Sequence, residues 1–502
     1  MPVFAAIDIG SNSVRLSVGE MRRGRIHVLH TDREVTRLGE GVFQNGQLDP
    51  QAMAHTIKVL RRFRKATDRF SAEQVQVLST SAVRDAKNSR VFADLLRSAT
   101  GWQLRIITGL EEGRLIHLGL QASGRFRATR KLLIDLGGGS CELTLSNRGH
   151  IQHMVSLPLG AVRLTQQFLK HDPPTEKELL RMNAFIDEEL GRVEHHFTAR
   201  VGLTVATSGT AAALASAASG VDEGGLVTQK QVVKPARKLS VMKRLERDHM
   251  PGINPRRAEI IIAGASVYAR IMTTLGLGRF RYSPLGLRDG ILAQMASDYD
   301  ARSRTHKQVE ADRRDALLWM CRRYKVDVEN SEHDSALALG LFRQLKSIHA
   351  LPAEYAEWIA AAALLQEVGS FVNRAGRYRH TYYIIANSEM FGFTPEERKL
   401  IATIARYQGN SIPQLNDRIV RALPPKRRHE AFKAIAVLRV ARALNHGRRK
   451  AVRGTSLRIT DSSVRLKLRA GRASAELEVW AAEKEADYFR EVFGRELVLA
   501  AT

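Results

Sequence analysis

One short pattern occurs twice in this chain, at positions 127 residues apart (134 − 7). Residues 7–13 have the sequence IDIGSNS, and residues 134–140 have the sequence IDLGGGS. In both copies an apolar stretch leads into Asp, a glycine-containing turn and Ser, and a second apolar stretch follows at 14–18 or at 142–145. Each copy therefore predicts a β-hairpin with a tight polar loop at its tip. Two copies so far apart predict two structurally related halves rather than one continuous sheet.

Strand and helix patterns alternate through the rest of both halves, which predicts mixed α/β layers. The expected elements are strands at 75–78 and 104–107 with helices at 86–99 and 111–121 in the first half, and helices at 160–170, 176–197 and 210–219 with a strand at 203–206 in the second. After about residue 300 the pattern changes, because apolar residues recur at helical spacing from 308 to 446.

The last stretch returns to strand alternation. Strands are expected at 457–459, 464–468 and 475–480, followed by a short helix at 483–493. The chain therefore predicts an α/β protein of four domains. These are two related α/β domains at 1–124 and 125–300, an all-helical domain at 301–446 and a small α+β domain at 447–502.

Basic residues exceed acidic residues over the whole chain. The 502 residues include 78 Lys and Arg against 52 Asp and Glu, which gives a formal net charge of +26. Such an excess favours a polyanionic partner: nucleic acid, polyphosphate, a nucleotide or an acidic lipid surface. A generally basic proteome would give the same balance. Aromatic residues make up only 6% of the chain, without an interleaved stacking pattern, and this argues against recognition of single-stranded nucleic acid.

Sorting signals and disulfides are not expected. The two cysteines, Cys141 and Cys321, lie in unrelated contexts and form neither a disulfide framework nor a CxxC metal site. The N-terminal residues show no basic leader followed by an apolar core, so we expect no signal peptide. No run of roughly 18 apolar residues occurs, so we expect no membrane span. These features predict a cytoplasmic protein.

The glycine-rich turn of the second copy has the composition of a phosphate-binding loop. Glycine lets backbone N–H groups approach an anion and adopt the dihedral angles that this requires. Asp135 stands at the strand end, where a carboxylate can hold Mg²⁺ or a water, and strand alternation can point Glu142 to the same side. A lone turn of this kind can be an ordinary tight turn, but its duplication favours phosphate binding. The expected phosphate-binding residues are Gly137, Gly138, Gly139 and Ser140 in the second copy, and Ser11, Asn12 and Ser13 in the first.

Two other loops follow strands and offer groups for an anion. Ser208, Gly209 and Thr210 open a helix whose free N–H groups can face a phosphate, although a plain Ser/Thr N-cap is the alternative. In the segment 79–85, Arg84 can hold phosphate oxygens through its planar guanidinium. An ordinary surface arginine is the alternative there.

Two glutamates, Glu111 and Glu112, begin the helix expected after the strand at 104–107. Hydrolysis of a phosphoanhydride needs a positioned water, a group that accepts its proton, and cations that offset charge on the transferring group. The glutamates can be simple complements of the helix dipole, or one of them can be the general base. The residues alone leave both interpretations open.

Five motifs occur in a fixed order along the first 300 residues. They lie at 8–13 (DIGSNS), 109–116 (GLEEGRLI), 134–142 (IDLGGGSCE), 206–210 (ATSGT) and 286–290 (GLRDG). Together they resemble the exopolyphosphatase / guanosine pentaphosphatase (Ppx/GppA) phosphatase family, which has the actin-like fold of sugar kinases and heat-shock ATPases. The resemblance continues through the helical and tail domains. The sequence departs from the family pattern at Cys141, where Thr is common, and at Pro284-Leu285, where family members vary.

The resemblance implies two actin-like (ribonuclease H-like) domains with the active site between them. It implies that Glu112 is the general base, that Asp135 and Glu142 serve the metal and the water, and that the loops described above contact phosphates. The expected metal ligands are Asp8, Asp135 and Glu142, and the expected cofactor is Mg²⁺. The family also implies a homodimer, and a substrate that is either long inorganic polyphosphate or guanosine pentaphosphate (pppGpp).

The helical domain resembles the HD-type metal phosphohydrolases in a degenerate form. His333 fits the first metal histidine, but Gln366 and Glu367 replace the expected His-Asp pair, and the region of the late Asp holds Arg442. Because Gln is a poor ligand for a transition metal, we expect no metal and no second active site there. His333 and His380 are then expected to be structural residues.

A basic segment lies at the end of the helical domain. Residues 421–450 contain ten Lys and Arg against one acidic residue, a local excess of +9 (10 − 1). Lys426, Arg427 and Arg428 can guide a long phosphate chain, whose binding would weaken steeply with salt; a solvated basic face is the alternative. We therefore expect a processive exopolyphosphatase that releases orthophosphate. The alternatives are a pppGpp 5′-phosphohydrolase, or a non-enzymatic binder of polyanions or nucleic acid.

Overall fold

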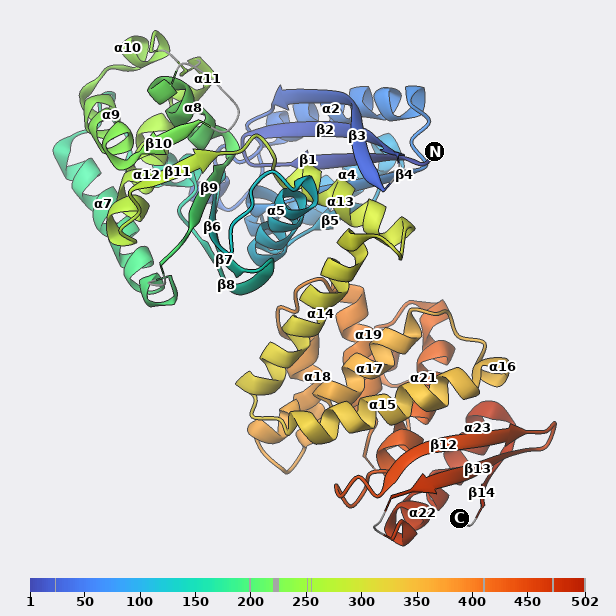
Figure 1. Cartoon of the computed structure of the whole chain (residues 1–502). Helices are drawn as coiled ribbons and strands as arrows, with labels where there is room; N and C mark the ends of the chain where they lie inside the picture. The colour runs from blue at the N-terminus through green and yellow to red at the C-terminus, as the bar shows by residue number, and fades with distance from the viewer. Residues whose placement is uncertain are drawn as a thin grey trace. The chain divides into compact units, whose positions relative to one another are not determined.

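The chain divides into two compact units, Met1–Asp312 and Arg313–Thr502 (Figure 1). The computed structural model describes residues 1–22, 24–197, 200–219, 225–250, 252–253, 255–409, 411–471 and 474–500. The division falls inside helix α14 (Arg304–Arg323), a few residues after the boundary expected at 300/301. Each unit has hydrophobic core clusters of its own.

A five-stranded mixed sheet forms the first half of the first unit, with the strand order β3-β2-β1-β4-β5. β1, β2 and β3 are antiparallel neighbours, whereas β4 pairs in parallel with β1 and β5 pairs in parallel with β4. The strands are β1 (Val3–Ile9), β2 (Ser13–Arg22), β3 (Arg25–Val35), β4 (Gln74–Ser79) and β5 (Leu104–Ile106). The helices are α1 (Val42–Asn45), α2 (Pro50–Arg69), α3 (Ser81–Asp85), α4 (Ser89–Thr100) and α5 (Gly109–Ser123).

The second half of this unit is built on a six-stranded sheet with the order β10-β11-β9-β6-β7-β8. Its strands are β6 (Arg130–Leu136), β7 (Cys141–Asn147), β8 (His150–Leu157), β9 (Leu203–Thr207), β10 (Leu226–Thr228) and β11 (Arg279–Tyr282). Its helices are α6 (Ala161–Phe168), α7 (Glu176–Gly191), η1 (Glu194–His196), α8 (Ser208–Ser219), α9 (Gln229–Val241), α10 (Arg244–Asp248), α11 (Pro255–Ala258), α12 (Ile261–Thr274) and α13 (Leu287–Tyr299). The helix expected at 176–197 thus ends at Gly191 and is followed by a short 3₁₀ turn.

The two sheets share a four-stranded arrangement. The order β3-β2-β1-β4 in the first half corresponds to β8-β7-β6-β9 in the second, with the same strand directions. The two expected hairpins are β1–β2 and β6–β7, and each is antiparallel with its polar turn at the tip. The prediction of two structurally related halves is therefore confirmed.

Helices α5 and α13 cross closely between the two sheets. A Cβ at Gly119 would lie 2.7 Å from the backbone nitrogen of Gly290, and a Cβ at Gly290 would lie 1.9 Å from the carbonyl oxygen of Leu115. Side chains at these two positions would force the helices apart, so glycine is required at both. Apolar residues of β1, β6, α5 and α13 form one core cluster at this crossing. The crossing fixes the N-terminal end of α5, which carries Glu111 and Glu112, relative to both sheets.

The second unit consists of helices and a three-stranded sheet with the order β12-β13-β14, which packs along α15 (Figure 1). After α14 the helices are α15 (Val328–Gln344), α16 (Lys346–His349), α17 (Tyr355–Leu365), η2 (Val368–Phe371), α18 (Arg377–Asn387), α19 (Pro395–Arg406), α20 (Arg418–Arg421), α21 (Pro425–Ala443), α22 (Glu476–Glu483) and α23 (Ala486–Phe493). The strands are β12 (Val452–Ile459), β13 (Ser463–Ala470) and β14 (Glu496–Ala500). One core cluster joins apolar residues from both sides of the boundary expected at 446/447.

The strand expected at 475–480 is wrong, because this segment belongs to α22. The alternation of small or apolar residues with glutamate suits a strand, but the same residues also have a helical periodicity. Ala475, Glu478 and Ala482 are buried at helical spacing, while Leu477 and Trp480 are about half exposed. The place of the third strand is taken by β14, which pairs in parallel with β13.

No helix in the described part of the chain is both long enough and apolar enough to cross a membrane.

Candidate active site

A cavity of about 260 Å³ lies between the two halves of the first unit, and the tips of both hairpins line it. Asp8 at the end of β1 and Asp135 near the end of β6 both face this cavity, together with Glu112 from α5. The remaining expected residues that line it are Ser11, Asn12, Ser13, Gly137, Gly138, Ser140, Ser208 and Gly209. The two copies of the repeated pattern therefore meet at one site.

The two hairpin tips have the same backbone hydrogen bond. Gly10 N donates to Ser13 O at 3.1 Å in the first tip, and Gly137 N donates to Ser140 O at 3.0 Å in the second. The tips also approach each other, because a Cβ at Gly138 would lie 3.0 Å from the Cβ of Ser11. Glycine at 138 thus allows the close contact of the two loops.

Gly139 is a packing residue and is absent from the lining of the cavity. A Cβ there would lie 2.2 Å from the hydroxyl oxygen of Ser81, which is hydrogen-bonded at 3.0 Å to the hydroxyl of Ser11. A Cβ at Gly160 would in turn lie 2.2 Å from the carbonyl carbon of Gly139. Gly139 therefore holds the second tip against the segment that carries Thr80 and Ser81, both of which line the cavity.

Three buried carboxylates converge at the second hairpin. Glu112, Asp135 and Glu142 each offer an oxygen, and these oxygens lie within 4.8 Å of one another. The hydroxyl of Ser156 donates to Glu142 Oε1 at 2.7 Å, and the hydroxyl of Thr207 donates to Asp135 Oδ1. The second oxygens of Glu112 and Glu142 are buried without a hydrogen-bond partner among the described residues. Buried polar atoms without partners are costly, so these oxygens are positioned for a ligand.

The electrostatics of this cluster favour a bound cation. Burial, followed by the charges of Glu142 and Asp135, raises the pKa of Glu112 well above its usual value. Burial and the charge of Asp135 raise the pKa of Glu142 to about 8. A divalent cation among the three groups would offset their mutual repulsion, and oxygen donors are the ligands that Mg²⁺ prefers. The residues present therefore fit Mg²⁺.

The two glutamates at the start of α5 have different surroundings. Glu111 accepts hydrogen bonds from Arg114 at 2.9 and 3.0 Å and from Arg105 at 3.2 Å. Glu112 lines the cavity and is only 8% exposed. The geometry thus separates a charge-paired structural glutamate from one that faces the cavity.

Asp8 lies on the cavity but outside the group of three carboxylates. Arg15 is its direct partner across the β1–β2 hairpin. Burial raises the pKa of Asp8, and the charge of Asp135 acts in the same direction, while Arg15 and Arg288 oppose the rise. Asp8 therefore has arginines as its charged neighbours, whereas Asp135 lies among other carboxylates.

Among the described residues, four arginines that sequence reasoning missed line the cavity: Arg15, Arg33, Arg257 and Arg288. Burial and the charges of Arg33 and Arg15 lower the pKa of Arg257 to about 10. Such a group of like charges is favourable when an anion lies among them. The four residues come from β2, β3, α11 and α13. Arg15 and Arg288 had local signals, since Arg15 follows the first tip in the repeated pattern and Arg288 lies in the motif at 286–290.

Arg84 and Thr210 are close to the cavity but do not line it. Arg84 Nη1 donates to the carbonyl oxygen of Ile107 at 3.1 Å, and its charge lowers the pKa values of Glu112 and Glu142 against the larger effect of burial. Thr210 is buried, and a Cβ at Gly264 would lie 2.7 Å from its side chain. Both roles as phosphate ligands stay predictions.

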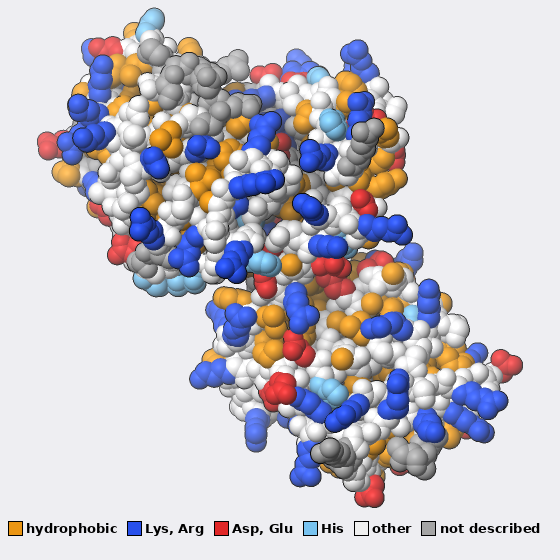
Figure 2. Space-filling view, viewed as in Figure 1, with side chains coloured by type: hydrophobic (Ala, Val, Ile, Leu, Met, Phe, Trp, Pro, Cys, Tyr) orange, Lys and Arg blue, Asp and Glu red, His pale blue; other side chains and the backbone are white. Residues whose placement is uncertain are grey.

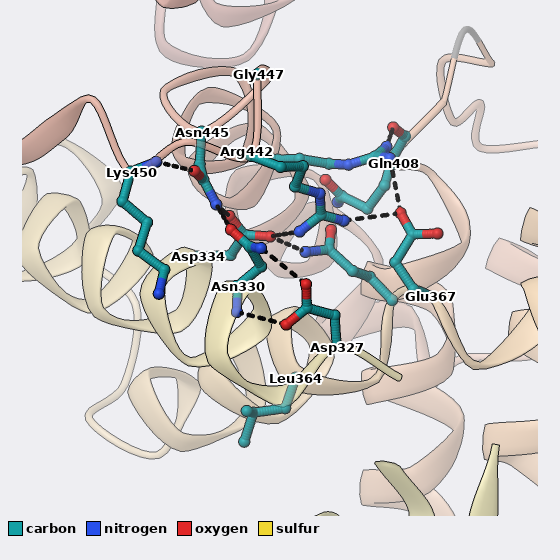
Figure 3. A network of polar contacts seen from close by, with 12 residues as sticks. Asp327, Asn330, Asp334, Leu364, Glu367, Gln408, Arg442, Asn445, Gly447 and Lys450 are labelled. Carbon is teal, nitrogen blue, oxygen red and sulfur yellow. Dashed lines mark hydrogen bonds and ion pairs between the residues drawn. The ribbon is translucent and has the colours of Figure 1, made fainter. Parts of the chain in front are cut away.

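In the second unit, the residues of the expected degenerate HD centre form a polar network (Figure 3). Gln366 donates to Asp334 at 2.7 Å, and Arg442 donates to Glu367 at 2.8 Å. His333 Nε2 lies 2.9 Å from the carbonyl oxygen of Val452. This contact is consistent with the structural role expected for His333. The resemblance to HD-type proteins stays a prediction.

The basic segment near the start of α21 has partners within its own unit. Arg427 contacts Glu430 at 3.3 Å and Glu354 at 3.6 Å. Arg428 donates to the carbonyl oxygens of Leu423 and Arg421 at 3.2 and 3.1 Å. Lys426 is exposed. Lys and Arg side chains outnumber Asp and Glu on the face drawn in Figure 2, so a basic surface is not confined to this segment.

Comparisons with known proteins agree with the resemblance drawn from the five motifs. The model of the Ppx/GppA phosphatase family matches residues 17–298, and the model of Ppx/GppA phosphatase domain III matches residues 313–479. The crystal structure of the Aquifex aeolicus member of the Ppx/GppA family is 30% identical with a TM-score of 0.52, and the match covers 60% of this chain and 99% of that one. The crystal structure of an exopolyphosphatase from Cytophaga hutchinsonii is 25% identical with a TM-score of 0.55, over 59% of this chain and 98% of that one.

These matches confirm the expected fold class, in which two actin-like domains are followed by a helical domain and a small α+β domain. The first family model alone spans more than half of the sequence (282 of 502 residues, from 298 − 17 + 1). The chain therefore belongs to the Ppx/GppA phosphatase family.

Proposed function

We propose that the protein is an exopolyphosphatase that processively hydrolyses the terminal phosphoanhydride bond of inorganic polyphosphate and releases orthophosphate. One observation carries this proposal: a single cavity combines the carboxylate of Glu112, two polar hairpin tips and four arginines. A group that accepts a proton and cations that hold phosphoryl oxygens are the main requirements for cleaving a phosphoanhydride. The phosphatase family of the chain supports the same reaction class.

Glu112 is the proposed general base. The oxygen of a water attacks the terminal phosphorus while the bond to the bridging oxygen breaks, and the bridging oxygen leaves with the electron pair on the shortened chain. Glu112 accepts the proton that the water loses. Its raised pKa makes it a stronger base than an exposed glutamate. Glu111 is less suited to this role, because Arg114 and Arg105 already engage its carboxylate.

The hairpin tips and the arginines are the proposed phosphate-binding groups. The glycine-containing tips, with Ser11, Ser13 and Ser140, and the start of α8 at Ser208 line the same cavity, and backbone N–H groups and hydroxyls of such segments can bind phosphate oxygens. Arg15, Arg33, Arg257 and Arg288 supply charge that a phosphate chain neutralises. These groups would hold the terminal phosphoryl group and its neighbour.

Mg²⁺ is the proposed cofactor, held chiefly by Asp135 and Glu142. The convergence of their oxygens within 4.8 Å and the partnerless oxygen of Glu142 support this assignment. When bound, the ion would offset negative charge on the phosphoryl oxygens. Asp8 remains a proposed outer partner of this centre, since its carboxylate interacts electrostatically with Asp135.

Polyphosphate is favoured over pppGpp by the composition of the cavity. At about 260 Å³ the cavity is smaller than most pockets that enclose a nucleotide-sized ligand. Tyr282 is the only aromatic side chain among the described residues that line it. A linear phosphate chain needs charge and hydrogen-bond donors, whereas a nucleoside also needs an apolar or aromatic wall. Guanosine pentaphosphate hydrolysis is the alternative.

The rest of the proposal concerns the protein around the site. Lys426, Arg427 and Arg428 are proposed to contact the distal part of a long chain, with exposed Lys426 contributing most because Arg427 and Arg428 have partners already. The free thiols of Cys141 and Cys321 are consistent with the proposed cytoplasmic location. A homodimer is proposed from the family resemblance.

The test is a side-by-side assay of phosphate release from long polyphosphate, pppGpp and ATP with Mg²⁺. We expect the highest kcat/KM for long polyphosphate, with no accumulation of intermediate chain lengths. A higher kcat/KM for pppGpp would replace the proposal with the alternative. Release from none of the three substrates would refute the enzymatic function altogether. The Glu112→Gln variant is the control for contaminating phosphatases.

A further inference from the structure

The second unit has a pocket of its own, with a volume of about 590 Å³. It opens between the end of α14, the start of α15, η2 and the start of α18, and it adjoins the polar network of Figure 3. Five of its lining residues are basic and two are acidic, a local excess of +3 (5 − 2). The basic residues are Lys325, Arg374, Arg377, Arg442 and Arg448, and the acidic residues are Asp327 and Glu367.

The network beside the pocket saturates its carboxylates with cationic and amide donors. Asp334 is fully buried and accepts from Asn445 at 2.8 Å, from Gln366 at 2.7 Å and from Arg448 at 2.9 Å. Glu367 in turn contacts Arg442 and Arg448. Guanidinium groups therefore occupy the faces of these carboxylates that a metal ion would need. The chemistry of this centre suits an anion rather than a cation.

Within the described part of the chain, the other three basic residues of the pocket are not neutralised by a carboxylate in this way. Lys325, Arg374 and Arg377 have no ion-pair partner among the described residues. Two atoms of lining residues, the Nε of Arg377 and the hydroxyl oxygen of Ser331, are buried without a hydrogen-bond partner there. Ser331 itself is only 1% exposed. A buried guanidinium donor and a buried hydroxyl without partners are the groups that a phosphate oxygen would satisfy.

One wall of the pocket is aromatic. The rings of Tyr324 and Phe371 meet edge to face, with their centroids 5.6 Å apart. Phe371 is 53% exposed, which is high for a large apolar side chain. An exposed ring beside a cluster of arginines provides a stacking surface next to an anion site. The catalytic cavity, by comparison, has arginines and a single aromatic residue among its described lining residues.

We propose that this pocket is a second binding site, which takes a nucleoside phosphate with its phosphate on Arg374, Arg377 and Ser331 and its base against Phe371. The site is separate from the catalytic cavity, since it lies wholly in the second unit and shares no lining residue with that cavity. The inference does not depend on which phosphoanhydride the enzyme cleaves. It assigns a ligand-binding role to the region where the sequence predicts a degenerate HD centre.

The test measures binding to the full chain by calorimetry, with AMP, GMP and ribose 5-phosphate as matched probes. The three probes share a phosphate and a ribose, and only the first two carry a base. Arg374→Glu should weaken AMP and GMP binding by at least ~10-fold, the scale of a lost charge-assisted hydrogen bond. Phe371→Ser should weaken AMP and GMP binding but leave ribose 5-phosphate binding unchanged. Both side chains are exposed, so folding should be preserved, and the thermal midpoint checks this.

Two control variants distinguish binding in this pocket from binding to a nearby basic surface or to the catalytic cavity. Arg379→Glu changes an exposed arginine on α18, the helix that Arg377 begins, and this arginine does not line the pocket. Arg33→Ala changes the catalytic cavity. We expect both controls to bind AMP like the unmodified protein. Equal weakening by Arg374→Glu and Arg379→Glu, weakening by Arg33→Ala alone, or ribose 5-phosphate binding as tight as AMP binding would each overturn the proposal.

Discussion

The two hairpin tips have the same backbone but opposite chemistry. Asp8 pairs across its hairpin with Arg15, whereas Asp135 pairs across the equivalent hairpin with Glu142. Both pairs occupy the same register positions, seven residues apart (15 − 8 and 142 − 135). One change of side-chain type therefore makes the first tip part of a basic wall and the second tip part of an acidic centre. A duplicated scaffold can thus supply both halves of a phosphoryl-transfer site.

The pKa shifts of the carboxylates and of Arg257 indicate that both walls of the cavity depend on a ligand. Burial, followed by the charges of neighbouring carboxylates, raises the pKa values of Glu112 and Glu142, and burial, followed by the charges of Arg33 and Arg15, lowers the pKa of Arg257. The acidic wall places like charges at buried positions, whereas the arginines of the basic wall repel one another at partly buried or exposed positions. Both arrangements are unfavourable by themselves, and the buried one more so. A cation on the acidic wall and a phosphate on the basic wall would relieve both.

The largest expected effect is on the acidic side. Glu112→Gln should lower kcat by at least ~10²-fold, because the proton of the attacking water would lose its acceptor. The measurement is steady-state phosphate release from polyphosphate. The matched control is Glu111→Gln. It should lower the thermal midpoint, since Glu111 is paired with Arg114, and it should lower kcat much less than Glu112→Gln does. A larger fall in kcat for Glu111→Gln would make Glu111 the base.

The second prediction tests the asymmetry of the two aspartates. Asp135→Asn should raise the Mg²⁺ concentration for half-maximal activity by ~10- to 100-fold, the range seen when the ligand environment of a metal is disturbed. Asp8→Asn should change it less, because Asp8 lies outside the three converging carboxylates. Direct titration with Mn²⁺ provides a readout apart from activity. Equal effects of the two variants would mean that both tips hold the metal.

The third prediction concerns the basic wall. Arg257→Gln should raise KM for polyphosphate by ~10-fold with a smaller change in kcat, because one charge-assisted contact to the substrate is lost. It should also make KM less sensitive to salt. An increase in thermal midpoint is expected at the same time, since the variant removes repulsion with Arg33 and Arg15. A fall in kcat with unchanged KM would place Arg257 at the transition state instead.

Much of this arrangement could be predicted from the sequence, and the exceptions have physical reasons. The hairpins and the glycine loops are local patterns, so neighbouring residues are enough to recognise them, whereas only the family resemblance favours Glu112 over Glu111. Arg33 and Arg257 belong to none of the five motifs in a chain with 78 Lys and Arg, and only the fold of β3 and α11 brings them to the cavity. No local signal distinguishes them from surface residues.

The errors and gaps elsewhere have similar causes. The segment 475–480 fits strand and helix periodicity equally well, and its packing in the second unit decided in favour of α22. Gly139 has the composition of a phosphate ligand, yet its close contact with Ser81 comes from a residue 58 positions away (139 − 81). Sequence patterns show what a residue can do, whereas tertiary packing decides which neighbours it has.

The smallest expected effect is on stability. It depends on the titration of one carboxyl group in each hairpin tip, Glu142 in the second and Asp8 in the first. The pKa of Glu142 is raised to about 8, so its carboxyl stays protonated in the folded protein at pH values where the unfolded chain has already ionised it. Without metal, this group therefore lowers the free energy of unfolding as pH rises from about 4.5 to about 8, by up to ~1.4 kcal/mol per pH unit. Glu142→Gln removes this titration.

In EDTA, the thermal midpoint of Glu142→Gln should therefore exceed that of the unmodified protein by a margin that grows between pH 6 and pH 8, reaching about a few degrees. Mg²⁺ should shrink the margin, because it stabilises only the protein that keeps the carboxylate. Asp8→Asn is the matched variant in the first tip, and its margin should grow less because Arg15 and Arg288 already oppose the rise in the pKa of Asp8. Equal margins for the two variants would mean that the tips do not differ electrostatically, and a margin that Mg²⁺ leaves unchanged would remove Glu142 from the metal centre.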